Sequence, residues 1–138
     1  MEQIYIIDDD KANRYLCTIV LEDCGVNVNN VYSFCMVKDA LNTLEHAMEI
    51  AANFPDIIFL DINLPGADGW SFLTNFRKFP EEARKHTKIF MLSSSIYPDD
   101  MERSKSFPEI VEFLSKPLST EMVEHILVQH FAHLKLRK

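Results

Sequence analysis

Four apolar runs in this chain each end in side chains that can take part in chemistry. The residues that follow them are, in order, Asp8-Asp9-Asp10, Asp61, Ser93 and Lys116. Carboxylates, a hydroxyl and an ammonium together could hold a divalent cation and a phosphoryl group. A carboxylate beside a cation and a lysine can attack phosphorus and form an acyl phosphate. This chemistry requires a fold that brings the four places together.

Asp61 follows the most apolar of these runs. The run, 57–60, has the length and composition of a strand buried on both faces. The turn-forming residues behind it are Pro65, Gly66 and Gly69. Apolar residues then recur at helical spacing, at Trp70, Phe72, Leu73 and Phe76. Asp61 is therefore expected at the carboxyl end of a central strand, where open α/β sheets bind ligands.

Strand and helix patterns alternate along the rest of the chain. Strands are expected at 4–7, 28–34, 57–60, 88–92 and 111–114. Helices are expected at 11–24, 37–51, 70–76 and 98–106, and from Ser119 or Thr120 onward. Asp10 is the expected N-cap of the first helix and Gly25 its stop signal. The buried stripe of that helix is predicted to be Ala12, Tyr15, Leu16, Ile19 and Val20, and Met101 is the expected anchor of helix 98–106.

Five such alternations predict an α/β fold, a five-stranded parallel sheet with helices on both faces. The flavodoxin-like strand order 2-1-3-4-5 is the common solution at this size, and residues 1–138 are expected to form a single domain. In that order strands one and four flank strand three, so the chemical side chains would surround Asp61. Each single residue has a simpler explanation, such as a helix cap or a strand end, but the whole set at one edge favours a functional site.

Carboxylates gathered in this way need a counter-charge. At about 4 Å and an effective dielectric near 20, each pair of like charges costs roughly 4 kcal/mol. Lys116 supplies one positive charge. Mg²⁺ suits the remaining all-oxygen ligands, because it binds one or two carboxylates and keeps several waters.

Composition excludes several other classes of protein. The formal net charge of −7 argues against general binding to nucleic acid. No apolar run approaches the roughly 18–20 residues of a membrane span, and the first residues lack the basic start of a signal peptide, so a cytoplasmic location is expected. Cys17, Cys24 and Cys35 are expected to be reduced residues in or near the core.

Four motifs resemble the receiver domain of two-component response regulators over nearly the full length. They are Ile7-Asp8-Asp9-Asp10, the stretch 60–69, Met91-Leu92-Ser93-Ser94 and Phe113-Leu114-Ser115-Lys116-Pro117. Two places depart from the family pattern. Ser94 stands where a small apolar residue is usual, and Phe107-Pro108-Glu109 replaces a Gly-Ala pair.

The resemblance implies a role for each site residue. Asp61 would be the phosphoacceptor and would bind Mg²⁺ together with Asp9 and the backbone carbonyl of Asn63, while Asp8 would act through a bound water. Ser93 would be the switch hydroxyl and Phe113 the switch aromatic. Lys116 would contact the phosphoryl group, and its bond to Pro117 would be cis.

The resemblance also implies partners. A histidine kinase or a phosphotransfer protein would supply the phosphoryl group, and a downstream protein would bind the face formed by 98–106, 111–114 and the last helix. Catalysis would be limited to self-phosphorylation and self-dephosphorylation. No direct contact with nucleic acid and no membrane insertion are expected, and the same face allows a transient homodimer.

Two other interpretations remain open at this point. The chain also resembles a small haloacid-dehalogenase-like phosphatase, with Asp8 as the nucleophile and Asp10 as the acid. Ala12 stands where that family expects threonine or valine, and no acidic pair follows Lys116. The third interpretation is a pseudo-receiver that is never phosphorylated, against which the complete set of site residues argues.

Overall fold

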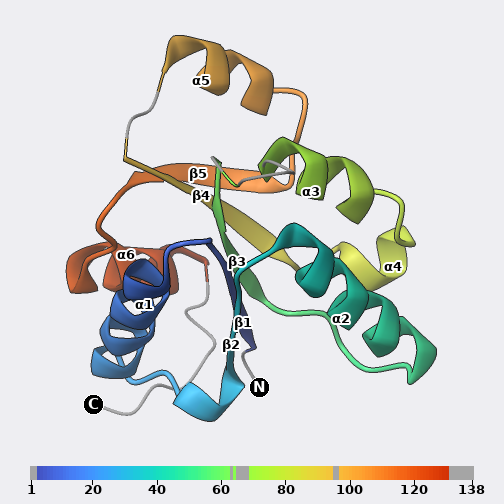
Figure 1. The fold of residues 1–138 in the computed structure, drawn as a ribbon, viewed down its shortest axis with the longest axis horizontal. Helices are drawn as coiled ribbons and strands as arrows, with labels where there is room; N and C mark the ends of the chain where they lie inside the picture. The colour runs from blue at the N-terminus through green and yellow to red at the C-terminus, as the bar shows by residue number, and fades with distance from the viewer. Residues whose placement is uncertain (1–2, 63, 65–68, 95–96, 131–138) are drawn as a thin grey trace.

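The structure, a computed structural model, describes residues 3–62, 64, 69–94 and 97–130. Its centre is a five-stranded parallel sheet in the order β2-β1-β3-β4-β5, which confirms the predicted topology (Figure 1). The strands are β1 Ile4–Ile7, β2 Val31–Phe34, β3 Ile57–Asp61, β4 Lys88–Ser93 and β5 Ile110–Ser115. Each lies within a few residues of its predicted position.

Helices cover both faces of this sheet (Figure 1). They are α1 Lys11–Asp23, α2 Val37–Glu49, α3 Gly69–Phe76, α4 Glu81–Arg84, α5 Pro98–Ser104 and α6 Thr120–His130, with a short 3₁₀ turn η1 at Val28–Asn30. The apolar core is split between the two faces, one part under α1 and α6 and the other under α2 and α3. The short helix α4 was not predicted; it lies in the polar connector 80–88.

The central strands are buried on both sides, as their composition predicted. Every residue of β1 and β3 is buried. Successive side chains of a strand point to opposite faces. Ile4 and Ile6 accordingly join the core under α1 and α6, while Tyr5 and Ile7 join the other one. Burial of the Tyr5 side chain, with the nearby Tyr32, raises the pKa of its phenol to about 12.

The predicted buried stripe of α1 is correct at Val20 but is otherwise wrong by about one helical position. The side chains that α1 buries are Asn13, Cys17, Val20 and Leu21, whereas Tyr15 is 69% exposed and Leu16 39% exposed. Helical periodicity gives the spacing of a stripe but not its rotation about the axis. Apolar residues of α1 lie on two neighbouring stripes, so their spacing alone does not select the stripe that meets the sheet.

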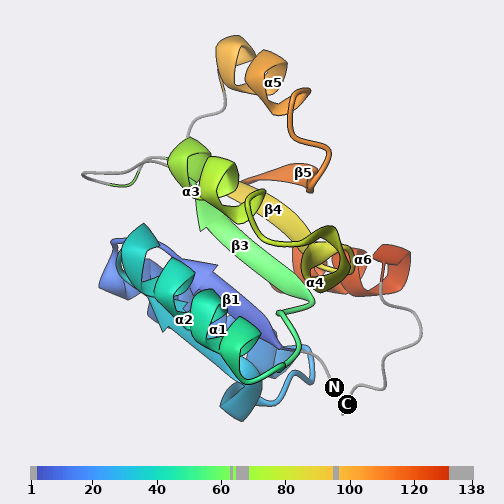
Figure 2. The ribbon, with the colours of Figure 1, turned by 90° about the vertical axis from the view of Figure 1, so that its right-hand side faces the viewer.

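Helix α5 contradicts a second prediction. Met101 is 47% exposed and α5 buries none of its residues. Both ribbon views show α5 set apart from the sheet (Figures 1 and 2). A helix of seven residues with one large apolar side chain cannot form a stripe wide enough to pack. One contact of α5 with the body is the Arg103 guanidinium, 4.9 Å from the centre of the Trp70 ring.

Several smaller predictions have clear outcomes. Asp10 caps α1 by accepting a hydrogen bond from the Ala12 amide, and Gly25 follows α1 with φ 94°. The Lys116–Pro117 bond is cis. All three cysteines are free, but only Cys17 and Cys24 are buried, so placing Cys35 near the core was wrong. Within the described ranges, no helix has the length and apolar character needed to cross a bilayer.

The stretch 107–109, which differs from the pattern of the resembled family, has a structural role that the sequence did not reveal. Arg77 donates two hydrogen bonds to the Glu109 carboxylate, at 2.8 and 3.1 Å, and Arg84 lies 3.6 Å from the same group. The Arg77 guanidinium also stacks over the Phe107 ring, 4.7 Å from its centre. This cluster attaches the chain before β5 to α3 and α4.

Replacing Glu109 with alanine is therefore expected to lower the free energy of unfolding by about 2 kcal/mol, because two arginines lose a half-buried carboxylate. Urea denaturation measures this change. Glu102→Ala is the matched control: Glu102 forms an exposed pair with Lys105 at 3.1 Å, so its loss should cost no more than about 0.5 kcal/mol. Equal losses in the two variants would show that the Glu109 cluster does not stabilise the fold.

Candidate functional site

The carboxyl ends of four strands bring the predicted site residues together. Asp61 is the last residue of β3 and pairs with Leu92 of the neighbouring strand β4. Ser93, at the end of β4, pairs with Ser115, and its carbonyl accepts a hydrogen bond of 2.9 Å from the Lys116 amide. Asp8 follows β1 on the other side of β3. The parallel strand order thus produces the convergence that the sequence predicted.

Lys116 links the two buried carboxylates. Its ammonium lies 2.9 Å from Asp8 Oδ2 and 3.3 Å from Asp61 Oδ2. Burial by itself would lower the pKa of this lysine, but the hydrogen bond to Asp8 and the charges of Asp8 and Asp61 outweigh it and raise the pKa above the ordinary 10.5. Lys116 therefore remains a cation at neutral pH.

Asp8 is held by more groups than the sequence indicated. Its side chain is buried, and Oδ1 accepts a hydrogen bond of 2.9 Å from the Asp10 amide. Oδ2 accepts one of 2.6 Å from the amide nitrogen of Asn13, and the Arg14 guanidinium donates to the Asp8 backbone carbonyl at 2.7 Å. Sequence reasoning missed Asn13 and Arg14. The available signal was the i, i+4 spacing of Asn13 and Cys17, which places an amide on the same helix face as a core residue.

The acidic residues are arranged to hold a cation. Asp8, Asp9 and Asp61 each offer a carboxylate oxygen, and these atoms lie within 4.8 Å of one another. They are the one such group of His, Cys, Asp and Glu in the described part of the chain. Asp9 is exposed while Asp8 and Asp61 are buried, so the group is open to solvent on one side. A group of oxygen ligands that is open to solvent on one side suits Mg²⁺, because Mg²⁺ keeps part of its water shell.

Three other predicted site residues have different outcomes. Ser93 is 1% exposed. Phe113, in β5, pairs with Met91 of β4. Its half-buried side chain packs against the core under α2 and α3. Because side chains alternate along a strand, Ser93 and Met91 share that face of the sheet, and Phe113 lies on it too. Asn63, whose carbonyl the resemblance assigns to the cation, is outside the described residues. Ser94, which departs from the family pattern, is exposed.

The buried thiol of Cys17 lies close enough to the site to be influenced by it. Burial and, to a lesser extent, the charge of Asp8 raise the pKa of Cys17, Lys116 acts in the opposite direction, and the resulting pKa is about 12. Such a thiol stays protonated and unreactive at neutral pH. This agrees with the prediction of a reduced core cysteine.

Gly69 is needed where α3 begins against the end of β3. A Cβ atom at this position would lie 2.7 Å from the backbone oxygen of Asp61 and 3.2 Å from the Cα of Ile62. The Gly69 amide donates to the Ile62 carbonyl at 2.9 Å, so the two backbones are already in contact. Glycine is the residue that allows this close approach.

Gly69→Ala is expected to lower the free energy of unfolding by about 2 kcal/mol, because the backbone that carries Asp61 would have to shift. Chemical denaturation measures the change. Thr74→Ala, on the exposed side of the same helix, is the control and should change stability by less than about 0.5 kcal/mol. If Gly69→Ala were as stable as Thr74→Ala, the close contact with Asp61 would not be a packing constraint.

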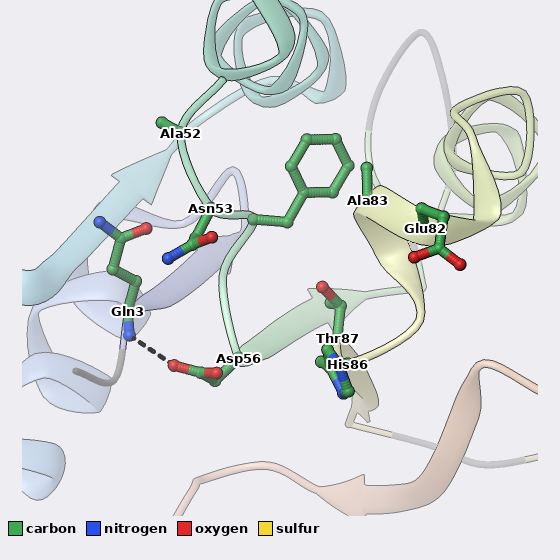
Figure 3. A pocket seen from close by; sticks show the side chains of 9 residues that line it. Gln3, Ala52, Asn53, Asp56, Glu82, Ala83, His86 and Thr87 are labelled. Atoms are coloured by element: carbon green, nitrogen blue, oxygen red, sulfur yellow. Dashed lines mark hydrogen bonds between the residues drawn. The ribbon is translucent and has the colours of Figure 1, made fainter. Parts of the chain in front are cut away.

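A pocket at the opposite edge of the sheet provides a contrast. It has a volume of about 430 Å³ and is lined by Gln3, Ala52, Asn53, Phe54, Asp56, Glu82, Ala83, His86 and Thr87 (Figure 3). Asp56 accepts a hydrogen bond of 3.1 Å from the Gln3 amide, so its carboxylate is already used in joining β1 to the chain before β3. None of the predicted site residues lines this pocket. This pocket is therefore separate from the candidate site, which lies at the carboxyl edge of the sheet.

Comparison with known proteins gives consistent matches. The family model described as response regulator receiver domain matches residues 4–127. Protein PilG of Pseudomonas aeruginosa is 30% identical over 86% of this chain and 79% of its own length. The cyclic di-GMP phosphodiesterase response regulator RpfG of Xanthomonas campestris is 30% identical over 83% of this chain, which spans only 28% of that protein. A receiver protein structure from Dyadobacter fermentans superposes with a TM-score of 0.79 at 26% identity, covering 95% of this chain and 98% of its own.

Proposed function

This chain belongs to the receiver domains of two-component response regulators, and from that membership we propose that it is a switch controlled by phosphorylation of Asp61. The proposal takes residues 1–138 as a single receiver domain. One observation supports it most strongly. Asp61 lies beside a protonated lysine that also binds Asp8, within a group of three carboxylates whose oxygens are at most 4.8 Å apart.

Each residue of the site would have a distinct part in the reaction. A carboxylate oxygen of Asp61 attacks the phosphorus of the donor, the bond from phosphorus to the donor breaks, and the donor leaves with that electron pair. Lys116 neutralises negative charge on the phosphoryl oxygens as they come close to Asp61. Bound Mg²⁺, held by Asp9 and Asp61 and the Asn63 carbonyl, with Asp8 acting through water, would offset the charge of the phosphoryl group.

The modified Asp61 would be sensed through Ser93 and Phe113. The Ser93 hydroxyl would donate a hydrogen bond to the phosphoryl group, and Phe113 would turn inward on the same face of the sheet. The consequence would be felt on the surface formed by α5, β5 and α6. Because α5 buries none of its own residues, few packing contacts need to break when it moves.

The partners follow from this scheme. A histidine kinase or a histidine phosphotransfer protein would donate the phosphoryl group, and a downstream protein would bind the surface formed by α5, β5 and α6, which also allows a transient homodimer. The net charge of −7 favours a protein target over nucleic acid. Tyr15 and Leu16 expose apolar surface on the helix that directly follows Asp9 and Asp10, so a protein donor is expected to contact them.

The phosphatase interpretation is not favoured. It needs Asp8 as the nucleophile, yet both oxygens of that carboxylate accept hydrogen bonds from within the fold. Such bonds lower the reactivity of a carboxylate because they stabilise its negative charge. As a receiver domain the chain is a signalling module, and its chemistry would be limited to gain and loss of its own phosphoryl group.

Incubation with acetyl phosphate and Mg²⁺, followed by peptide mass spectrometry, tests the proposal. We expect one phosphoryl group on the peptide that contains Asp61, and none when Mg²⁺ is removed with a chelator. Phosphorylation of Asp8 would instead support the phosphatase interpretation. An unmodified chain that also fails to bind Mg²⁺ would identify a pseudo-receiver.

A further inference from the structure

We propose that Asn13 is a positioning residue for the cation site, because its side-chain amide sets the orientation of the Asp8 carboxylate. This inference rests on the proposed function, since it assumes that Mg²⁺ binds beside Asp8, Asp9 and Asp61. Neither the resemblance nor the motifs that carry it assign a role to Asn13, which lies in the first turn of α1.

Several donors surround the Asp8 carboxylate. Oδ2 accepts a hydrogen bond from Asn13 at 2.6 Å and forms an ion pair with Lys116 at 2.9 Å, and Oδ1 accepts a hydrogen bond from the Asp10 amide at 2.9 Å. A carboxylate has about four acceptor positions, two on each oxygen. Among the described residues, three positions are filled and the fourth, on Oδ1, is left for the cation or its water.

The Asp8 carboxylate and the Asn13 amide cannot easily rearrange. Asp8 is 0% exposed and Asn13 is 8% exposed, so neither can exchange its partner for bulk water. The carboxylate can only accept, which means that the amide nitrogen of Asn13 must face it. If the carboxylate rotated, the Asn13 donor would be left buried without an acceptor, which is unfavourable.

The Asn13 side chain carries no charge. A lysine or arginine at this position could also donate to Asp8, but it would add positive charge beside a cation site that Lys116 already partly neutralises. A neutral amide holds the carboxylate and weakens its attraction for Mg²⁺ less than a positively charged donor would. Residues that orient metal ligands in this way usually change metal affinity by about 10–100-fold when they are replaced.

The test compares Mg²⁺ binding by two leucine variants of the full chain. Asn13→Leu keeps a similar shape but removes the donor, and we expect its dissociation constant for Mg²⁺, measured by titration calorimetry, to rise at least about tenfold. Asn75→Leu is the matched control, because Asn75 is also a helical asparagine and donates to the Ser71 carbonyl at 2.9 Å on α3. Its Mg²⁺ affinity should match that of the wild type.

A second measurement uses the wild-type chain and avoids the risk of a misfolded variant. In nuclear magnetic resonance spectra, the side-chain amide signals of Asn13 should shift as Mg²⁺ is added, while those of Asn75 stay in place. If the wild type binds Mg²⁺ but the Asn13 signals do not shift, or a folded Asn13→Leu variant keeps wild-type affinity, this inference is wrong and the proposed function stands. A wild type that binds no Mg²⁺ would overturn both.

Discussion

Asp61→Asn is expected to abolish phosphorylation by acetyl phosphate. The amide of asparagine is a poor nucleophile, and Asp8, the other described carboxylate in contact with Lys116, has both oxygens engaged by hydrogen bonds within the fold. Mass spectrometry should show the phosphorylated peptide in the wild type and only background modification in the variant. Transfer of the phosphoryl group to Asp8 or Asp9 at the wild-type rate would contradict the assignment.

The same variant should remain folded. Asp61 is 5% exposed and belongs to the group of three carboxylates, so removing its charge relieves repulsion. In buffer without divalent cations we expect the free energy of unfolding to rise by about 1 kcal/mol. This increase, measured in urea, separates a lost nucleophile from a lost fold. Added Mg²⁺ should stabilise the wild type more than the variant, because the variant has lost one of the carboxylates that would hold the cation.

Lys116→Met is expected to lower both stability and phosphorylation. It leaves Asp8 and Asp61 buried without the cation that lies 2.9 and 3.3 Å from them. Breaking a buried pair from one side typically costs about 3 kcal/mol of unfolding free energy at neutral pH. The phosphorylation rate with acetyl phosphate should fall about 100-fold, because charge on the phosphoryl oxygens is no longer neutralised. Lys88→Met, at the opposite end of β4, is the control and should retain both properties.

The stability that Lys116 provides should depend on pH in one direction. Its pKa in the folded chain is raised above the ordinary 10.5, so folding favours the protonated form. The stabilisation is fully present below pH 10.5 and is lost as the pH rises through the raised value. The difference in unfolding free energy between wild type and Lys116→Met should therefore shrink in strongly alkaline buffer. A difference that grew with alkaline pH would mean that Lys116 is not held by the carboxylates.

Much of the fold could be predicted because its signals are local. Apolar runs marked four of the five strands, and the residues after them set the order of the chemical groups along the chain. Parallel strands with right-handed crossovers leave few arrangements, so the strand order followed from the alternation of elements. The approach of Asp8, Asp61, Ser93 and Lys116 was predictable for the same reason, since the carboxyl ends of parallel strands meet at one edge.

Contacts between distant parts of the chain could not be predicted in this way. Arg77 and Glu109 are 32 residues apart, and no periodicity connects them. The rotation of α1 about its axis does not follow from the spacing of its apolar residues, which is why Tyr15 and Leu16 were wrongly placed in the core. The same rotation turns Asn13 toward Asp8.

The sequence by itself therefore determined the strands, the helices other than α4, and which chemical groups reach the carboxyl edge of the sheet. Spacing along the chain carries that information, because strands and helices repeat with fixed periods. The tertiary structure decided how those groups are held: Lys116 between two carboxylates, Asn13 on Asp8, and Gly69 against the backbone of Asp61. These arrangements depend on distances across the fold, which are set only when the helices pack on the sheet.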